Sequence, residues 1–205
     1  MVECVLDAAQ YTAANLNKAT PFTGMSTNVA LLIPTGDPIK KLSPGCYVVE
    51  GPEEDVLARY EIAYKHYFPD FLVRITGDCP LITPQIIKKH ITSAVMHGLD
   101  YCSNSIDDFR TYVDGYDCEI LSARAMKWLF ENATSPYDRE HVTTALKASP
   151  PAWAKFGVVI SALDLSHLKF SVDTQAEFDV VKGNKATLEK KTRSARNKGY
   201  AVFRF

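Results

Sequence analysis

The chain has no long apolar run, no paired cysteine motif and almost no net charge. No uninterrupted apolar stretch approaches the roughly 20 residues that a membrane-spanning helix needs, so no transmembrane segment is expected. The formal net charge of -1 leaves no overall field to attract nucleic acid or an anionic membrane. Met1-Val2-Glu3-Cys4 lacks the basic start and apolar core of a secretory signal. We therefore expect neither nucleic acid nor membrane as a partner.

The cysteines are few and scattered. There are five, an odd number, and no two form a C-x-x-C pair. This argues against a zinc site or a disulfide framework and for reduced thiols. We expect a cytoplasmic protein. The cysteines are Cys4, Cys46, Cys79, Cys102 and Cys118.

The length and composition are those of an ordinary globular domain. The 205 residues include 46% hydrophobic and 23% charged residues, enough to build a full core. No internal repeat, low-complexity tract or linker divides the chain, so we expect a single domain over 1–205. Residues 182–205 would be the end of its last helix and an edge strand.

Short β-rich apolar runs alternate with helical patterns through most of the chain. Alternation of this kind predicts an α/β fold with a mostly parallel sheet covered on both faces. The strands are expected at 29–33, 46–49, 71–76, 101–104, 117–121, 156–160, 170–172 and 200–203. The helices are expected at 2–16, from 51–52 to about 67, from 83–84 to 97, 123–132, 135–148 and 174–191.

The stretch 74–82 lies at the centre of this pattern. A buried strand ends at the Gly77-Asp78 turn, and Thr83-Pro84 then opens a helix as N-cap and first helical residue. Ligands of open α/β sheets bind at the carboxyl ends of strands. Asp78 can therefore hold a divalent cation against phosphate oxygens. The alternative is a turn residue whose carboxylate bonds nearby N–H groups.

A second aspartate lies at a similar place. Asp173 follows the expected strand 170–172 and precedes a helix that Thr174 and Glu177 open as a capping box. Strand ends of this kind can converge on one side of a sheet, where two aspartates suit Mg²⁺ bound to a nucleoside triphosphate. An acid next to a helix N-terminus is also favourable for dipole reasons alone.

Three further segments can carry chemistry. The acidic loop 112–119, which contains Asp114, Asp117 and Glu119, can bind sugar hydroxyls or a second cation, or be a solvated turn. Arg139 can pair with a phosphate or carboxylate, and His141 can carry a proton; a surface ion pair and a capping histidine are equally consistent. The lysines and arginines of 182–198 have no interleaved aromatics and are expected on a solvated helix face.

Four ordered blocks together resemble one family. The chain is similar to the cytidylyltransferases of the spore-coat polysaccharide type, relatives of the enzymes that make CMP-activated sialic acid and CMP-activated 3-deoxy-manno-octulosonate. The order and spacing fit over roughly residues 1–182. The blocks are 51–60 (GPEEDVLARY), 73–82 (VRITGDCPLI), 114–119 (DGYDCE) with 139–143 (REHVT), and 170–174 (FSVDT) with Glu177-Phe178.

The resemblance implies a nucleotide-diphospho-sugar transferase (GT-A-like) fold, a three-layer α/β/α sandwich. It implies attack of a sugar or sugar-acid hydroxyl on the α-phosphate of CTP, for surface polysaccharide biosynthesis, with Mg²⁺ as cofactor. Asp78 and Asp173 would hold the ion, and Arg74 would contact nucleotide or sugar. A homodimer is compatible with it. The residues implied to contact the substrate are Asp114, Asp117, Glu119, Arg139 and His141.

The chain departs from the family pattern at its start. The family opens with a strand and an Arg-, Gly-, Ser- and Lys-rich phosphate loop, whereas this sequence begins at the helix that follows them, an N-terminally truncated version of the fold. Nothing in 17–27 replaces that loop, so we expect weak or no CTP turnover by these 205 residues alone. The alternative to an enzyme that needs the missing segment is a non-catalytic relative that binds a sugar, a nucleotide or a partner.

Overall fold

A computed structural model describes residues 1–16, 18, 22–42, 45–183 and 201–203. Its contacts divide the chain into two compact units. The first comprises Met1–Thr12, Val73–Ile120 and Lys155–Phe205, and the second comprises Ala13–Leu72 and Leu121–Ala154. Within the described residues, no helix is both long and apolar enough to cross a membrane.

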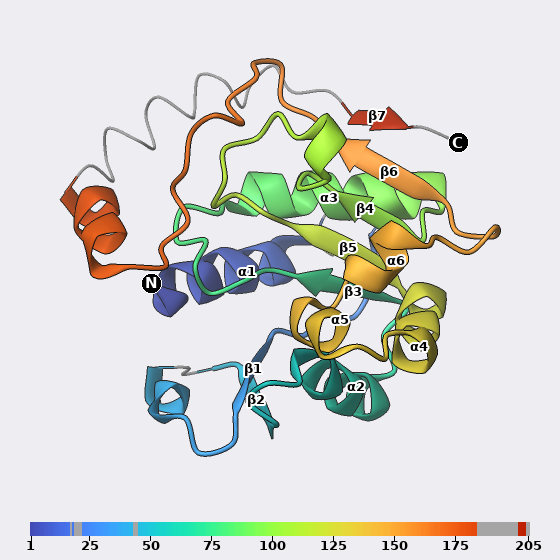
Figure 1. The fold of residues 1–205 in the computed structure, drawn as a ribbon, viewed down its shortest axis with the longest axis horizontal. Helices are drawn as coiled ribbons and strands as arrows, with labels where there is room; N and C mark the ends of the chain where they lie inside the picture. Colours follow the sequence, from blue (N-terminus) through green and yellow to red (C-terminus); the bar gives the residue numbers. More distant parts are fainter. Residues whose placement is uncertain (17, 19–21, 43–44, 184–200, 204–205) are drawn as a thin grey trace. The chain divides into compact units, whose positions relative to one another are not determined.

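The first unit is built on a five-stranded sheet in the order β3-β5-β4-β6-β7 (Figure 1). Strands β4 and β6 pair in parallel, whereas β7 joins β6 antiparallel at the edge. The expected α/β class with a mostly parallel sheet is thereby confirmed. The strands are β3 (Phe71–Arg74), β4 (Tyr101–Ser103), β5 (Glu119–Ser122), β6 (Phe156–Val159) and β7 (Ala201–Phe203).

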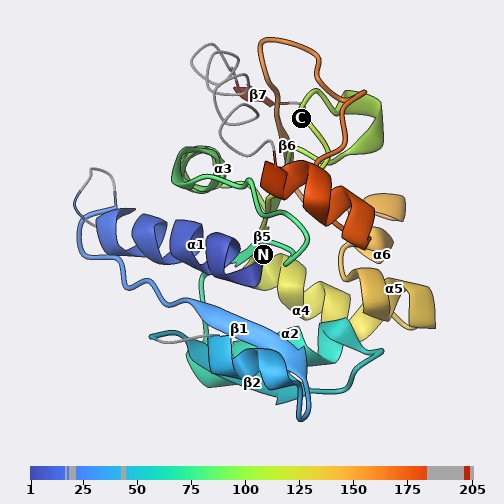
Figure 2. The same ribbon diagram turned by 90° about the vertical axis from the view of Figure 1, so that its left-hand side faces the viewer.

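Helices cover one face of this sheet. Figures 1 and 2 show α3 (Pro84–His97) and the first turns of α1 (Val2–Leu16) on the same side of the strands. Thr83 and Pro84 stand at the N-cap and first position of α3 as expected, but the Thr83 side chain makes no capping hydrogen bond. Gly98 ends the helix in a left-handed conformation with its N–H bonded to the last turn. The turn after β3 therefore lies between the strand at one end of the described order and the first turn of α3. A short 3₁₀ helix, η2 (Asp107–Phe109), lies in the loop after β4.

The second unit has a small parallel sheet of β1 (Ala30–Pro34) and β2 (Tyr47–Gly51). Helix α2 (Val56–Tyr67) packs on both strands and on α5 (Pro136–His141). Its other elements are η1 (Pro38–Leu42), α4 (Ala123–Asn132) and α6 (Thr144–Ala148).

The prediction of one helix over 135–148 was wrong, because the structure has two helices there, α5 and α6. Val142 has φ 64° and ψ -57°, and the N–H of Thr143 donates to the carbonyl of His141 at 2.7 Å. This is a γ-turn, a strained conformation for a β-branched residue. The Val142 side chain is completely buried, so packing of that side chain offsets the backbone strain.

The strand expected at 170–172 was also wrong. The segment makes a single isolated bridge, between Lys169 and Asp114, and no ladder. Its amides bond instead to the neighbouring loops: the carbonyl of Asp114 accepts from Phe170 at 2.6 Å and from Ser171 at 3.1 Å. The helix after it begins at residue 175 and is described to residue 183; the rest of the expected helix and most of the basic segment 182–198 lie outside the described residues.

Candidate functional site

In the turn after β3, Asp78 is half-buried between the exposed Gly77 and the buried Cys79. The N–H of Cys79 donates to the carbonyl of Thr76 at 3.3 Å, and their side chains are also 3.3 Å apart. Cys79 is buried, and burial, followed by the charge of Asp78, raises the pKa of its thiol to about 12. The thiol therefore stays protonated and fixes the turn. The Cys79 sulfur lies 3.9 Å from Asp78 Oδ1.

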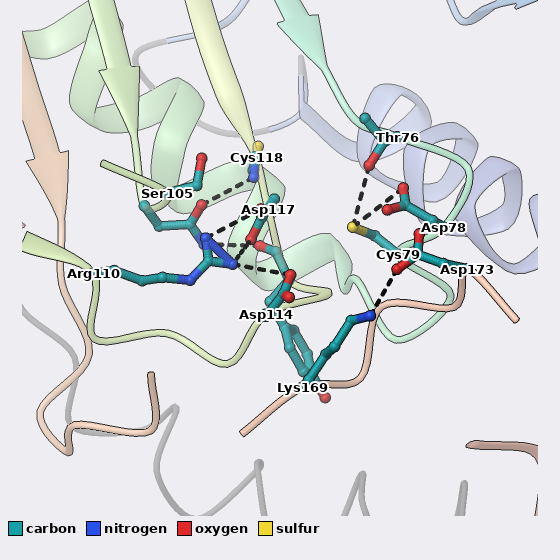
Figure 3. A network of polar contacts seen from close by, with 12 residues as sticks. Thr76, Asp78, Cys79, Ser105, Arg110, Asp114, Asp117, Cys118, Lys169 and Asp173 are labelled. Atoms are coloured by element: carbon teal, nitrogen blue, oxygen red, sulfur yellow. Dashed lines mark hydrogen bonds and ion pairs between the residues drawn. The ribbon is translucent and has the colours of Figure 1, made fainter. Parts of the chain in front are cut away.

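Asp173 is brought to this turn by a backbone hydrogen bond rather than by a strand. The N–H of Val172 donates to the carbonyl of Asp78 at 2.9 Å, which joins residues 94 positions apart in sequence (172 minus 78). This bond puts the two segments in contact, and Figure 3 draws the Asp78 and Asp173 side chains in the same part of the polar network. The structure thus brings the two predicted aspartates together, although the expected strand before Asp173 is absent.

A capping box fixes the backbone of Asp173. Glu177 Oε2 accepts from the N–H groups of Asp173 (2.8 Å) and Thr174 (2.9 Å), as expected for a box. Lys169 Nζ then bridges the second Glu177 oxygen, at 2.6 Å, and Asp173 Oδ2, at 2.7 Å. These bonds lower the pKa of Glu177 to about 2.

The acidic loop packs directly against the segment that carries Asp173. Gly115 has φ +102°, and a Cβ there would overlap the backbone of Phe170 and Ser171. Only glycine allows this approach. The approach places Asp114 and Asp117 near the aspartate pair, where their charges are held by an arginine (Figure 3).

That arginine is Arg110, which the sequence analysis missed. Its guanidinium donates to both oxygens of Asp117, at 2.6 and 3.2 Å, and to Asp114 at 3.2 Å. Burial raises the pKa of Asp117 to about 6, although Arg110 opposes the shift. The only signal in the sequence was spacing, since Arg110 precedes the two acids by four and seven residues.

Arg74 and Glu119 lie together on neighbouring strands. Arg74 Nη1 is 2.7 Å from Glu119 Oε2, and the hydroxyl of Tyr101 donates to the other Glu119 oxygen. The Glu119 side chain is only 3% exposed and that of Arg74 is 17% exposed. In this structure Glu119 is an internal partner of Arg74 and Tyr101, and its contact with an acceptor stays a prediction.

The other two predicted site residues belong to the second unit. Arg139 Nε donates to Asp55 Oδ2 at 2.6 Å, and Asp55 also caps α2 through Ala58. His141 is exposed, with its ring 4.3 Å from that of Tyr137. Their contact with substrate stays a prediction.

The donor set at the aspartate pair is suited to a hard cation. Mg²⁺ takes one or two carboxylates and completes its shell with water and substrate phosphate. The described residues contain no cluster of three or more His, Cys, Asp or Glu that could hold a metal by themselves. Two carboxylates therefore fit an ion that arrives with a phosphate ligand better than a structural metal.

Comparison with known proteins gives a family for this architecture. A family model described as Cytidylyltransferase matches residues 35–189. An uncharacterized protein of Methanocaldococcus jannaschii is 29% identical over 150 residues, which are 68% of this chain and 60% of that protein's length. A cytidylyltransferase from Leptospira borgpetersenii, of known structure, has the same fold: its TM-score is 0.75, with 23% identity, over 96% of this chain and 86% of that one.

Proposed function

Because the chain belongs to the cytidylyltransferase family, we propose that it transfers CMP from CTP to a hydroxyl of a sugar or sugar acid, with release of pyrophosphate. The observation that carries the proposal is the Val172–Asp78 hydrogen bond, which brings Asp173 to Asp78. The spore-coat-type blocks favour an acceptor used in surface polysaccharide assembly. The acceptor and the role in assembly are part of the proposal.

Asp78 and Asp173 would hold Mg²⁺, which when bound supplies positive charge against the phosphate oxygens. The protein's own contribution is to hold the backbone that carries these carboxylates before substrate arrives, through the turn bonds of Cys79 and the capping box of Glu177. Backbone positions fixed in advance do not have to be ordered during the reaction.

The acidic loop supplies acceptors suited to hydroxyl groups. Asp114 and Asp117 are anchored by Arg110, so they can accept hydrogen bonds from a polyhydroxylated acceptor without first being ordered. Arg74, oriented by Glu119, remains a candidate contact to nucleotide or sugar. Positioning of both reactants is the main requirement of phosphoryl-type transfer.

The first test is isothermal titration of CTP in the presence of Mg²⁺, with Asp78→Asn as the matched variant. The proposal expects saturable binding that requires Mg²⁺ and weakens about tenfold or more in the variant, since one ion ligand is lost. Absence of Mg²⁺-dependent CTP binding would overturn it.

The second test is pyrophosphate release with CTP and a panel of neutral sugars and sugar acids. Release with one acceptor, even at a slow rate, supports the transferase. CTP binding without release from any acceptor would contradict transfer by these 205 residues and favour the non-catalytic binding module.

A further inference from the structure

Lys169 touches Asp173 and has no place in the proposed chemistry. Its Nζ lies 2.7 Å from Asp173 Oδ2 (Figure 3) and 2.6 Å from Glu177 Oε1. We propose that Lys169 neutralises Asp173 while no cation is bound and moves to the phosphates of CTP when Mg²⁺ and nucleotide bind. This inference rests on the proposed function.

The geometry makes lysine and cation competitors. Lys169 contacts one of the two oxygens that Asp173 could offer to an ion, and Mg²⁺ approaches carboxylate oxygens to about 2.1 Å. An ammonium group at 2.7 Å from the same oxygen would face a doubly charged ion at close range. Repulsion at such a distance favours departure of the lysine.

The lysine can move while its backbone stays. Residue 169 is fixed by the bridge to Asp114, whose N–H donates to the Leu168 carbonyl at 3.0 Å. Its side chain is 47% exposed and that of Asp173 is 58% exposed, so neither is locked by packing. The four-carbon stem of lysine lets the ammonium swing through several ångströms from a fixed Cα.

The phosphates provide the new partner. A triphosphate whose oxygens share the ion with Asp173 must lie within a few ångströms of that carboxylate, and therefore within reach of Lys169. Lysine binds phosphate as a compact point charge. The residue would thus exchange one anionic partner for another, and the charge balance of the site would be kept in both states.

The proposal predicts opposite effects of one substitution on two ligands. Lys169→Met should bind Mn²⁺ alone about two- to fivefold tighter, because an exposed competing ion pair is removed. The same variant should bind CTP with Mg²⁺ about tenfold more weakly at 150 mM salt, because a charge-assisted contact is lost. Lys169→Arg should retain CTP affinity within about threefold.

The experiment is electron paramagnetic titration of Mn²⁺ together with calorimetric titration of CTP, and Lys88→Met on the exposed surface of α3 is the matched control. Weaker binding of both ligands would show that Lys169 only positions Asp173 and would overturn the proposal. Unchanged CTP binding, or a CTP loss that disappears at 0.5 M salt, where long-range charge effects are screened, would also overturn it.

Failure of the proposed function would look different. Wild-type protein would then bind no Mn²⁺ in a manner sensitive to Asp78→Asn, whatever residue 169 is. If wild type binds Mn²⁺ in a manner that depends on Asp78, and Lys169→Met binds both Mn²⁺ and CTP more weakly, the proposed function stands. Only the proposed role of Lys169 is then overturned.

Discussion

Substitution of Glu119 tests whether this acid supports the site from within. The carboxylate is 3% exposed and has Arg74 Nη1 at 2.7 Å on one oxygen and the Tyr101 hydroxyl on the other. Glu119→Gln keeps the shape of the side chain but replaces one oxygen with an amide nitrogen. Gln can still accept from Tyr101, so its amide nitrogen then faces Arg74, donor against donor.

The expected loss of unfolding free energy is about 3 to 5 kcal/mol, the usual cost of leaving one member of a buried ion pair without its partner. Tyr101→Phe removes only the neutral donor and should cost about 1.5 to 3 kcal/mol, as a bond to a charged group. The double variant Arg74→Met with Glu119→Leu removes both charges but also the acceptor of the Tyr101 hydroxyl, so it should recover part of the loss, to within about 2 to 3 kcal/mol of wild type.

The assay is urea unfolding followed by far-ultraviolet circular dichroism at pH 7. The reasoning is refuted if Glu119→Gln costs less than about 1 kcal/mol, or if the double variant is no more stable than the single one. Either result would mean that the charge of Arg74 is balanced mainly elsewhere.

Three further changes test the packing around the site and the second unit. Gly115→Ala should lower the free energy of unfolding by at least about 2 kcal/mol, because φ is +102° there and the added Cβ meets the backbone of Ser171. Gly98→Ala is the control: φ is +58° but the added Cβ meets no atom, so the loss in the same urea unfolding assay should be only about 1 to 2 kcal/mol. Burial lowers the pKa of His90 to about 4, so its contribution is present above pH 6.5 and is lost as the pH falls towards 4. Wild type should lose about 2 kcal/mol from this group between pH 7 and pH 5, and His90→Leu should have a flatter stability profile there in urea titrations. Asp55→Ala removes the cap of α2 and an ion pair to α5 and should cost about 1 to 2 kcal/mol, of which Asp55→Asn should recover about 1 kcal/mol by keeping the cap; equal losses in the two variants would contradict the capping role.

Local sequence signals predicted the secondary structure correctly where they agreed with one another. The strand before Arg74, the turn at Asp78 and the helix that Thr83 opens and Gly98 ends were all predicted within a residue or so. Each depends on neighbouring residues: a β-rich apolar run, a glycine, a proline and a capping residue. The antiparallel edge strand β7 was predicted in the same way.

The errors arose where distant contacts decide the backbone. Val172 looks like a strand residue, but its N–H is taken by the Asp78 carbonyl. Val142 lies in an apparently continuous helix, but its burial is accompanied by a γ-turn. The local sequence reveals neither cause: the Asp78 carbonyl lies 94 positions from Val172, and the burial of Val142 depends on tertiary packing.

The sequence pointed to the acids of the candidate site but not to two of the cations beside them, Lys169 and Arg110. Asp78 and Asp173 stood out because they precede or follow expected elements, and the structure brings them together. Lys169 and Arg110 carry no motif of their own and acquire meaning only when folding places them beside those acids. Spacing of four or seven residues from an aspartate is too common to identify such partners in advance.

The central claim is that Asp78 and Asp173 bind one divalent cation together with CTP. It is tested most directly by anomalous diffraction from crystals of the chain grown with Mn²⁺ and CTP. The account predicts a single strong Mn²⁺ peak that both carboxylates and a phosphate oxygen of CTP coordinate. A peak bound by only one of these aspartates, or an ion and nucleotide located away from both, would contradict it.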